Sequence, residues 1–94
     1  MEEEIQRVRI PKGNEIFGLV EAKLGGNKVR VRCQDNKIRI CRIPGRLKKR
    51  MWVNIGDSII VELWSVQPDE RGDVILKYSK AQAEWLRKRG ILKL

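Results

Sequence analysis

The chain has 94 residues, 41% of them hydrophobic, so it can bury one modest core and forms a single domain. Its 21 lysines and arginines against 12 acidic residues give a net charge of +9, which favours a polyanionic partner, nucleic acid ahead of an anionic membrane. We expect neither a membrane span, because no stretch approaches roughly 18 apolar residues, nor a signal peptide, because MEEEIQR is acidic and polar.

Cysteine and histidine usage argues against a metal site and against catalysis. Cys33 and Cys41 are too few for a disulfide scaffold, and without histidine they are too few for a zinc site. We therefore expect reduced thiols in a cytosolic protein, with no metal and no cofactor. An enzyme such as a nuclease would need carboxylates that converge on one site, whereas most acidic residues here fall at turns. The sequence predicts a binding module and not an enzyme.

The elements follow in chain order after a polar arm. Gly18 predicts a bend or bulge in the first strand, Gly25-Gly26-Asn27 predicts a hairpin turn, and Asp35-Asn36 predicts the next one. The segments NKVRVRCQ and KIRICRI on either side of that turn alternate between apolar and basic residues, as half-buried strands do. The predicted strands cover residues 15–23, 27–34, 37–43, 58–66 and 73–79.

The residue pattern changes to a helical one after the last strand. Ser79 and Gln82 have the spacing of a capping box, and Gly90 is a suitable stop for a short helix. Five short strands and one terminal helix predict an all-β fold, a five-stranded OB-fold barrel with a short C-terminal α-helix, because closure removes the exposed edges of an open sheet. We expect a polar N-terminal arm over 1–14, the barrel over 15–79, and the helix and tail over 80–94.

The central hairpin predicts a basic face. A two-residue turn at Asp35-Asn36 would place Arg32 opposite Arg39, a like-charge pair that disfavours the sheet. Such a pair is tolerated on a solvated surface, but mixed charges would serve solvation better, and a phosphate across the hairpin would relieve the repulsion. The expected inner face holds Val29, Val31, Cys33, Ile38 and Ile40, whereas the expected outer face holds Arg30, Arg32, Lys37, Arg39 and Cys41.

The segment IPGRLKKRMWV, residues 43–53, leaves this hairpin at the rim of the basic face. Trp52 has two interpretations: a plug in the core or at the barrel end, or a stacking platform for an unpaired base. Trp64 and Trp85 are expected to pack. Because other aromatic residues are few, recognition should depend mainly on phosphates and RNA shape. The residues that extend the basic patch are Arg42, Arg46, Lys48, Lys49 and Arg50.

The stretches IPGRLKKRMWVNIGD, SIIVEL and DVILKY (73–78), the last followed by a helix, resemble translation initiation factor one-A of archaea and eukaryotes, the counterpart of bacterial initiation factor one. The resemblance covers about residues 15–89 and implies an S1-like OB-fold. It implies binding to rRNA at the decoding A site of the small ribosomal subunit, together with other initiation factors. It implies RNA contacts from a basic loop, Arg46, Lys48, Lys49, Arg50 and Trp52, and from a strand face, Arg30, Arg32 and Arg39.

Eukaryotic members of that family have a long basic N-terminal tail and a long acidic C-terminal tail. Neither is present in this sequence, so it is similar to the archaeal members. The alternative function is a general single-stranded RNA chaperone of cold-shock type, but such domains need several exposed aromatic residues where this chain has Arg and Lys. A membrane-binding peptide is disfavoured because the basic residues lie on strands and loops. We expect a cytoplasmic monomer with no membrane partner.

Overall fold

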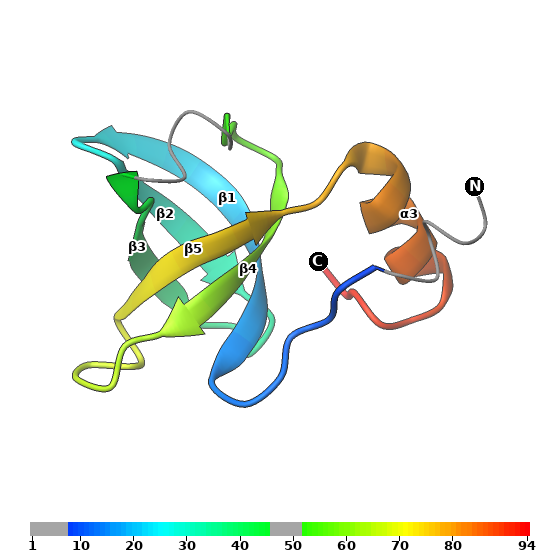
Figure 1. Ribbon diagram of the computed structural model, residues 1–94, viewed down its shortest axis with the longest axis horizontal. Coiled ribbons are helices and arrows are strands. Elements are labelled where there is room, and N and C mark those ends of the chain that lie inside the picture. The colour runs from blue at the N-terminus through cyan, green and yellow to red at the C-terminus, as the bar shows by residue number, and fades with distance from the viewer. Residues whose placement is uncertain (1–7, 46–51) are drawn as a thin grey trace.

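The computed structural model describes residues 8–45 and 52–94, which form a closed five-stranded barrel with a helix at one side (Figure 1). The strands follow the order β1-β2-β3-β5-β4, and β4 pairs back onto β1. Only β3 and β5 run parallel among these pairs. This arrangement confirms the predicted all-β OB-fold barrel with a short C-terminal helix. The elements are β1 (Glu15–Gly25), β2 (Lys28–Cys33), β3 (Ile38–Arg42), β4 (Ser58–Leu63), β5 (Arg71–Lys77) and α3 (Lys80–Lys88).

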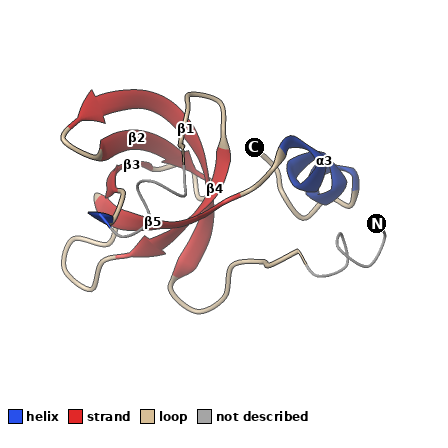
Figure 2. Cartoon of the chain, turned by 45° about the horizontal axis from the view of Figure 1, so that its top comes forward, coloured by secondary structure: helices blue, strands red, loops and turns tan. Residues whose placement is uncertain are grey.

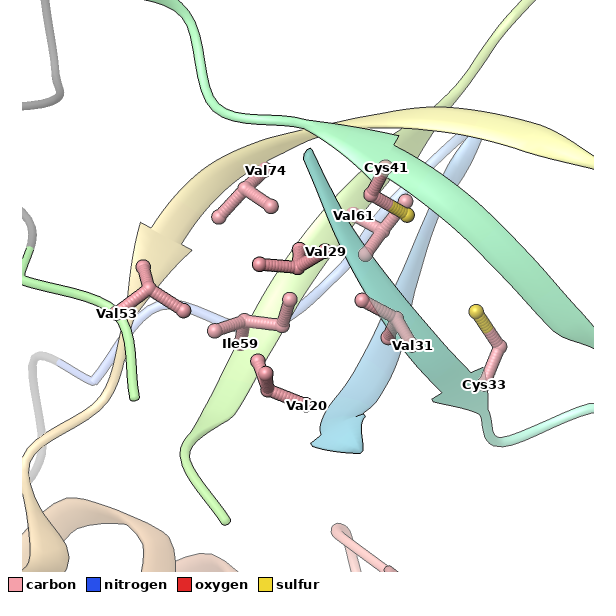
Figure 3. Close-up of a cluster of buried hydrophobic side chains, with 9 residues drawn as sticks. All are labelled: Val20, Val29, Val31, Cys33, Cys41, Val53, Ile59, Val61 and Val74. Atoms are coloured by element: carbon pink, nitrogen blue, oxygen red, sulfur yellow. The ribbon is translucent and has the colours of Figure 1, made fainter. Parts of the chain in front are cut away.

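The interior of the barrel is a cluster of small and β-branched side chains (Figure 3). Along β2 exposed and buried residues alternate strictly, because successive side chains of a strand point to opposite faces. Val29, Val31 and Cys33 therefore point inward, as predicted, and basic residues occupy the positions between them. The cluster is completed by Val20, Cys41, Val53, Ile59, Val61 and Val74.

Figure 2 shows α3 beside the barrel, and a second apolar cluster joins the outer wall of the barrel to this helix. The predicted capping box is present: the Ser79 hydroxyl accepts from the Gln82 amide at 3.2 Å, and the Gln82 side chain accepts from the Ser79 amide at 3.0 Å. Gly90 follows the helix with φ 73°, as expected of a stop. Leu92 is 2% exposed, so the C-terminal segment docks on its own barrel. The cluster consists of Phe17, Ile60, Tyr78, Ala83, Leu86 and Leu92.

The β2–β3 hairpin has a different register from the one expected. Arg32 lies opposite Ile38, and Val31 lies opposite Arg39. The turn contains three residues, 34–36, instead of two: the Asn36 amide donates to the Cys33 carbonyl at 2.9 Å, and the Cys33 amide donates to the Lys37 carbonyl at 2.9 Å. Asn36 has a left-handed φ of 69°, as three-residue hairpin turns require.

This one-residue shift exchanges the two faces of β3, since side chains alternate with period two. Cys41 is fully buried, whereas Ile38 is 46% exposed and Ile40 is only half-buried. The expectation that Ile38 and Ile40 point into the core and Cys41 points outward is therefore wrong. Figure 3 shows the thiols of Cys33 and Cys41 among the apolar side chains of the barrel interior, where burial raises the pKa of Cys41 to about 12.

Two glycines let the barrel strands pack closely. The expected bulge at Gly18 is not observed there: the register of β1 shifts between Val20 and Ala22 and again near its end. A Cβ at Gly18 would instead collide with Cγ1 of Val31. Gly72 on β5 is similar, because a Cβ there would collide with Cγ1 of Val61 and approach the Glu62 carbonyl oxygen to 3.0 Å. Both positions require a residue without a side chain.

We predict that Gly72→Ala destabilises the protein by about 1–3 kcal/mol, the usual cost of overpacking a filled core. The matched control is Gly45→Ala, because a Cβ at Gly45 would meet no atom of residues 8–45 and 52–94 within 4 Å. Chemical denaturation of both variants measures the free energy of unfolding. Equal stabilities for the two variants would contradict the close packing of β5 on β4.

Candidate functional site

The outer face of β2 carries a row of cations. Lys28, Arg30 and Arg32 are exposed and stand at alternate positions, about 7 Å apart along the strand. Their inward neighbours anchor the strand in the core, so the row has a rigid base. Across the hairpin, Lys28 lies opposite another cation, Arg42. The two arginines of β2 lie opposite isoleucines of β3, Arg30 opposite Ile40 and Arg32 opposite Ile38. The observed face is therefore less uniformly basic than the expected one.

Three exposed residues among the expected RNA contacts already face carboxylates. Arg32 Nε lies 3.5 Å from Glu21 Oε2, and Lys37 Nζ lies 2.8 Å from Asp69 Oδ1. Arg42 Nε lies 3.3 Å from Asp73 Oδ1, with its guanidinium carbon 5.6 Å from the centre of the Trp64 ring. Within residues 8–45 and 52–94, neither Lys28 nor Arg30 has a carboxylate within 4.0 Å. Their charges are the least compensated on this face.

Arg39 is not on the exposed face, contrary to expectation, because the register of β3 turns it inward. Its side chain is 1% exposed and makes a two-pronged contact with Asp35, Nη1 to Oδ1 at 2.9 Å and Nη2 to Oδ2 at 2.8 Å. Nε donates to the Pro68 carbonyl oxygen at 2.6 Å. Arg39 therefore ties the β2–β3 turn to the loop between β4 and β5. The contact with the Arg39 guanidinium lowers the pKa of Asp35.

Trp52 is 73% exposed, so its interpretation as a plug in the core or at the barrel end is wrong. The adjacent Val53 is 4% exposed and enters the barrel cluster instead. The indole lines a pocket of about 280 Å³ together with the β1–β2 turn and Lys28, which places it near one end of the cationic row. An exposed indole on a fixed backbone is suited to stacking on an unpaired base.

The other two tryptophans make intramolecular contacts. Trp85 is half-buried against the cluster between the barrel and α3, as expected. Trp64 donates through Nε1 to Asp73 Oδ1 at 3.0 Å. The remaining predicted contact residues, Arg46, Lys48, Lys49 and Arg50, lie outside the described residues.

Neither a metal cluster nor a membrane helix is found in the described part of the chain. Residues 8–45 and 52–94 contain no group of three or more His, Cys, Asp and Glu side chains placed to hold a metal ion. The helix in the same residues is too short to cross a membrane.

The Asp35 contact generates a pH-dependent prediction. Because the folded-state pKa of Asp35 lies below its unfolded value of about 3.8, the ion pair contributes stability above that value, and this contribution is lost as pH falls through the folded pKa. We predict that Asp35→Asn costs about 1–2 kcal/mol at pH 7, between the values for an exposed and a fully buried ion pair, because Arg39 is buried and Asp35 is partly exposed.

Urea unfolding of the wild type and Asp35→Asn between about pH 2 and 7 checks this prediction. The difference in free energy of unfolding should be constant near neutrality and should shrink below about pH 4. A difference that is the same at both ends of the range would show that the charge of Asp35 does not stabilise the turn.

The closed barrel and its strand order define an OB-fold protein, and its outer face is basic. The family model described as Translation initiation factor 1A / IF-1 matches residues 5–93. Translation initiation factor 1A of Pyrococcus abyssi is 49% identical over 88 residues, covering 94% of this chain and 78% of that protein. The same-named protein of Methanococcus maripaludis strain C7 is 51% identical over 88 residues, covering 92% and 85%.

A solved structure agrees with these relatives. The solution structure of translation initiation factor one from the Wolbachia endosymbiont strain TRS of Brugia malayi superposes with a TM-score of 0.56 at 25% identity, covering 84% of this chain and 87% of that one. The chain belongs to the translation initiation factor 1A / IF-1 family. The resemblance drawn from the sequence, including its archaeal character, is confirmed.

Proposed function

We propose that the protein binds rRNA at the decoding A site of the small ribosomal subunit and promotes initiation there, together with other initiation factors. Membership of the family supports a role in translation initiation at the ribosome. The observation that carries the proposal is the cationic row on β2, whose members Lys28 and Arg30 have no carboxylate partner within the described residues. Uncompensated charges on a rigid strand favour phosphates, because binding releases the counterions condensed on the RNA.

The residues of the face have different roles in this proposal. Lys28 and Arg30 contact phosphates, and Arg32 does so in competition with Glu21. Trp52 stacks on an unpaired base at the end of the row. Arg39 only supports the face, because its side chain is buried. The family's basic loop, Arg46, Lys48, Lys49 and Arg50, contributes further phosphate contacts in this proposal. Lys37 and Arg42 contribute less, because carboxylates partly neutralise their charges.

We predict that the protein pellets with purified small subunits, but not with large subunits, in a salt-dependent manner. With about five phosphate contacts, the slope of log K against log[salt] should be about −4. Arg30→Gln should reduce its magnitude by about one. Lys80→Gln is the matched control, an exposed lysine at the start of α3, away from the row, and it should leave the slope unchanged.

Two results would contradict the proposal. Equal binding to both subunits, or to any single-stranded RNA, would favour a general RNA chaperone. A slope that Arg30→Gln leaves unchanged, with the melting temperature also unchanged, would remove the β2 row from the binding surface.

A further inference from the structure

Residues 52–57 form a tight turn that leads into β4 and is held by backbone and side-chain hydrogen bonds. The Asn54 amide donates to Asp57 Oδ2 at 2.7 Å, and the Asp57 amide donates to the Asn54 carbonyl oxygen at 3.1 Å. The Gly56 amide donates to the carbonyl oxygen of Val20 on β1 at 2.8 Å. The turn is therefore fixed to the barrel wall at its C-terminal end.

Lys77, near the end of β5, joins the two ends of this turn. Its Nζ donates to the Trp52 carbonyl oxygen at 2.7 Å and lies 3.2 Å from Asp57 Oδ2. The same carbonyl oxygen accepts from Asn54 Nδ2 at 3.4 Å. The Lys77 side chain is 29% exposed and its Asp57 partner 21%, so water has limited access to the pair. The ammonium is bound on two sides within the protein.

The residue that Lys77 holds is the exposed tryptophan. The Trp52 backbone is bound through its carbonyl, and the next residue, Val53, is anchored in the core, yet the Trp52 side chain is 73% exposed. A large exposed apolar side chain contributes little to folding stability. Fixing its backbone holds the turn and also favours binding, because an ordered contact residue loses less conformational entropy when its partner docks.

We propose that Lys77 is a positioning residue for RNA: it fixes the backbone of Trp52 so that the indole is presented, already ordered, to an unpaired base. The inference rests on the proposed function, since the ligand of Trp52 is the RNA described there. Lys77 does not itself contact a phosphate, because Asp57 neutralises its charge and the Trp52 carbonyl oxygen takes one of its donors. Lys77 therefore affects RNA affinity only by positioning Trp52.

The first part of the test uses the free protein. Lys77→Met keeps the aliphatic stem and removes the ammonium, and Lys80→Met is the matched control on α3. The backbone {1H}–15N NOE should fall at Trp52 in Lys77→Met, and should stay at the wild-type level in the control. Unchanged values at Trp52 in Lys77→Met would overturn the inference without any reference to RNA.

The second part is a double-mutant cycle on small-subunit binding with Lys77→Met, Trp52→Ala and the double variant. Trp52→Ala should weaken binding by about 5- to 150-fold, the range for loss of one stacked base. Lys77→Met should weaken it at least about threefold in the wild-type background, with the salt slope unchanged, and should have no further effect once Trp52 is absent.

Three outcomes would overturn the inference: an undiminished effect of Lys77→Met in the Trp52→Ala background, a salt slope smaller by about one, or unchanged affinity in Trp52→Ala. The first two leave the proposed function intact as long as the wild type still binds small subunits in a salt-dependent way. The third also removes Trp52 from the RNA contacts of the proposed function, but it leaves small-subunit binding through the β2 row intact. Loss of that wild-type binding is instead the failure of the proposed function.

Discussion

The buried contact between Arg39 and Asp35 is the interaction on which the arrangement of the basic face depends. A guanidinium that is 1% exposed requires partners for its donors, and here it finds both carboxylate oxygens of Asp35 and the Pro68 carbonyl oxygen. These bonds are compatible only with the register in which Arg39 points inward. They also connect two loops at the same end of the barrel, so this end is held by a charge-assisted network and not by apolar packing alone.

This register separates the basic residues into structural and available ones. Arg39 is buried and bound to Asp35, whereas the charges of Lys37 and Arg42 are partly neutralised by Asp69 and Asp73. The β2 row remains exposed, with isoleucines of β3 beside two of its members. The repulsion between Arg32 and Arg39 that a two-residue turn would impose does not arise. The like-charge pair that remains on this face is Lys28 opposite Arg42, and the Arg42 guanidinium lies beside the Asp73 carboxylate. The face is therefore stable without a ligand and can remain open for one.

Local signals in the sequence predict most of the fold. The predictions that failed concern features set by contacts between residues far apart in the chain. Alternation along β2 and the Ser79–Gln82 capping box depend on neighbouring residues, so both were predictable. The faces of β3 were not, because Asp35-Asn36 suits two-residue and three-residue turns alike. The inward position of Arg39 depends on Asp35 and also on the Pro68 carbonyl oxygen, which is far away in the chain. The position of Trp52 was open for the same reason: its carbonyl partner, Lys77, is on another strand.

The most direct test of this account is the pairing of Ile38 across the hairpin, measured as Hα–Hα NOEs in solution. A three-residue turn makes Arg32 and Ile38 a closely spaced pair without mutual hydrogen bonds, in which the α-protons approach each other. The account predicts a strong NOE between the α-protons of Arg32 and Ile38. A strong NOE between those of Cys33 and Ile38 would instead establish the two-residue turn, place Arg39 on the surface and contradict the account.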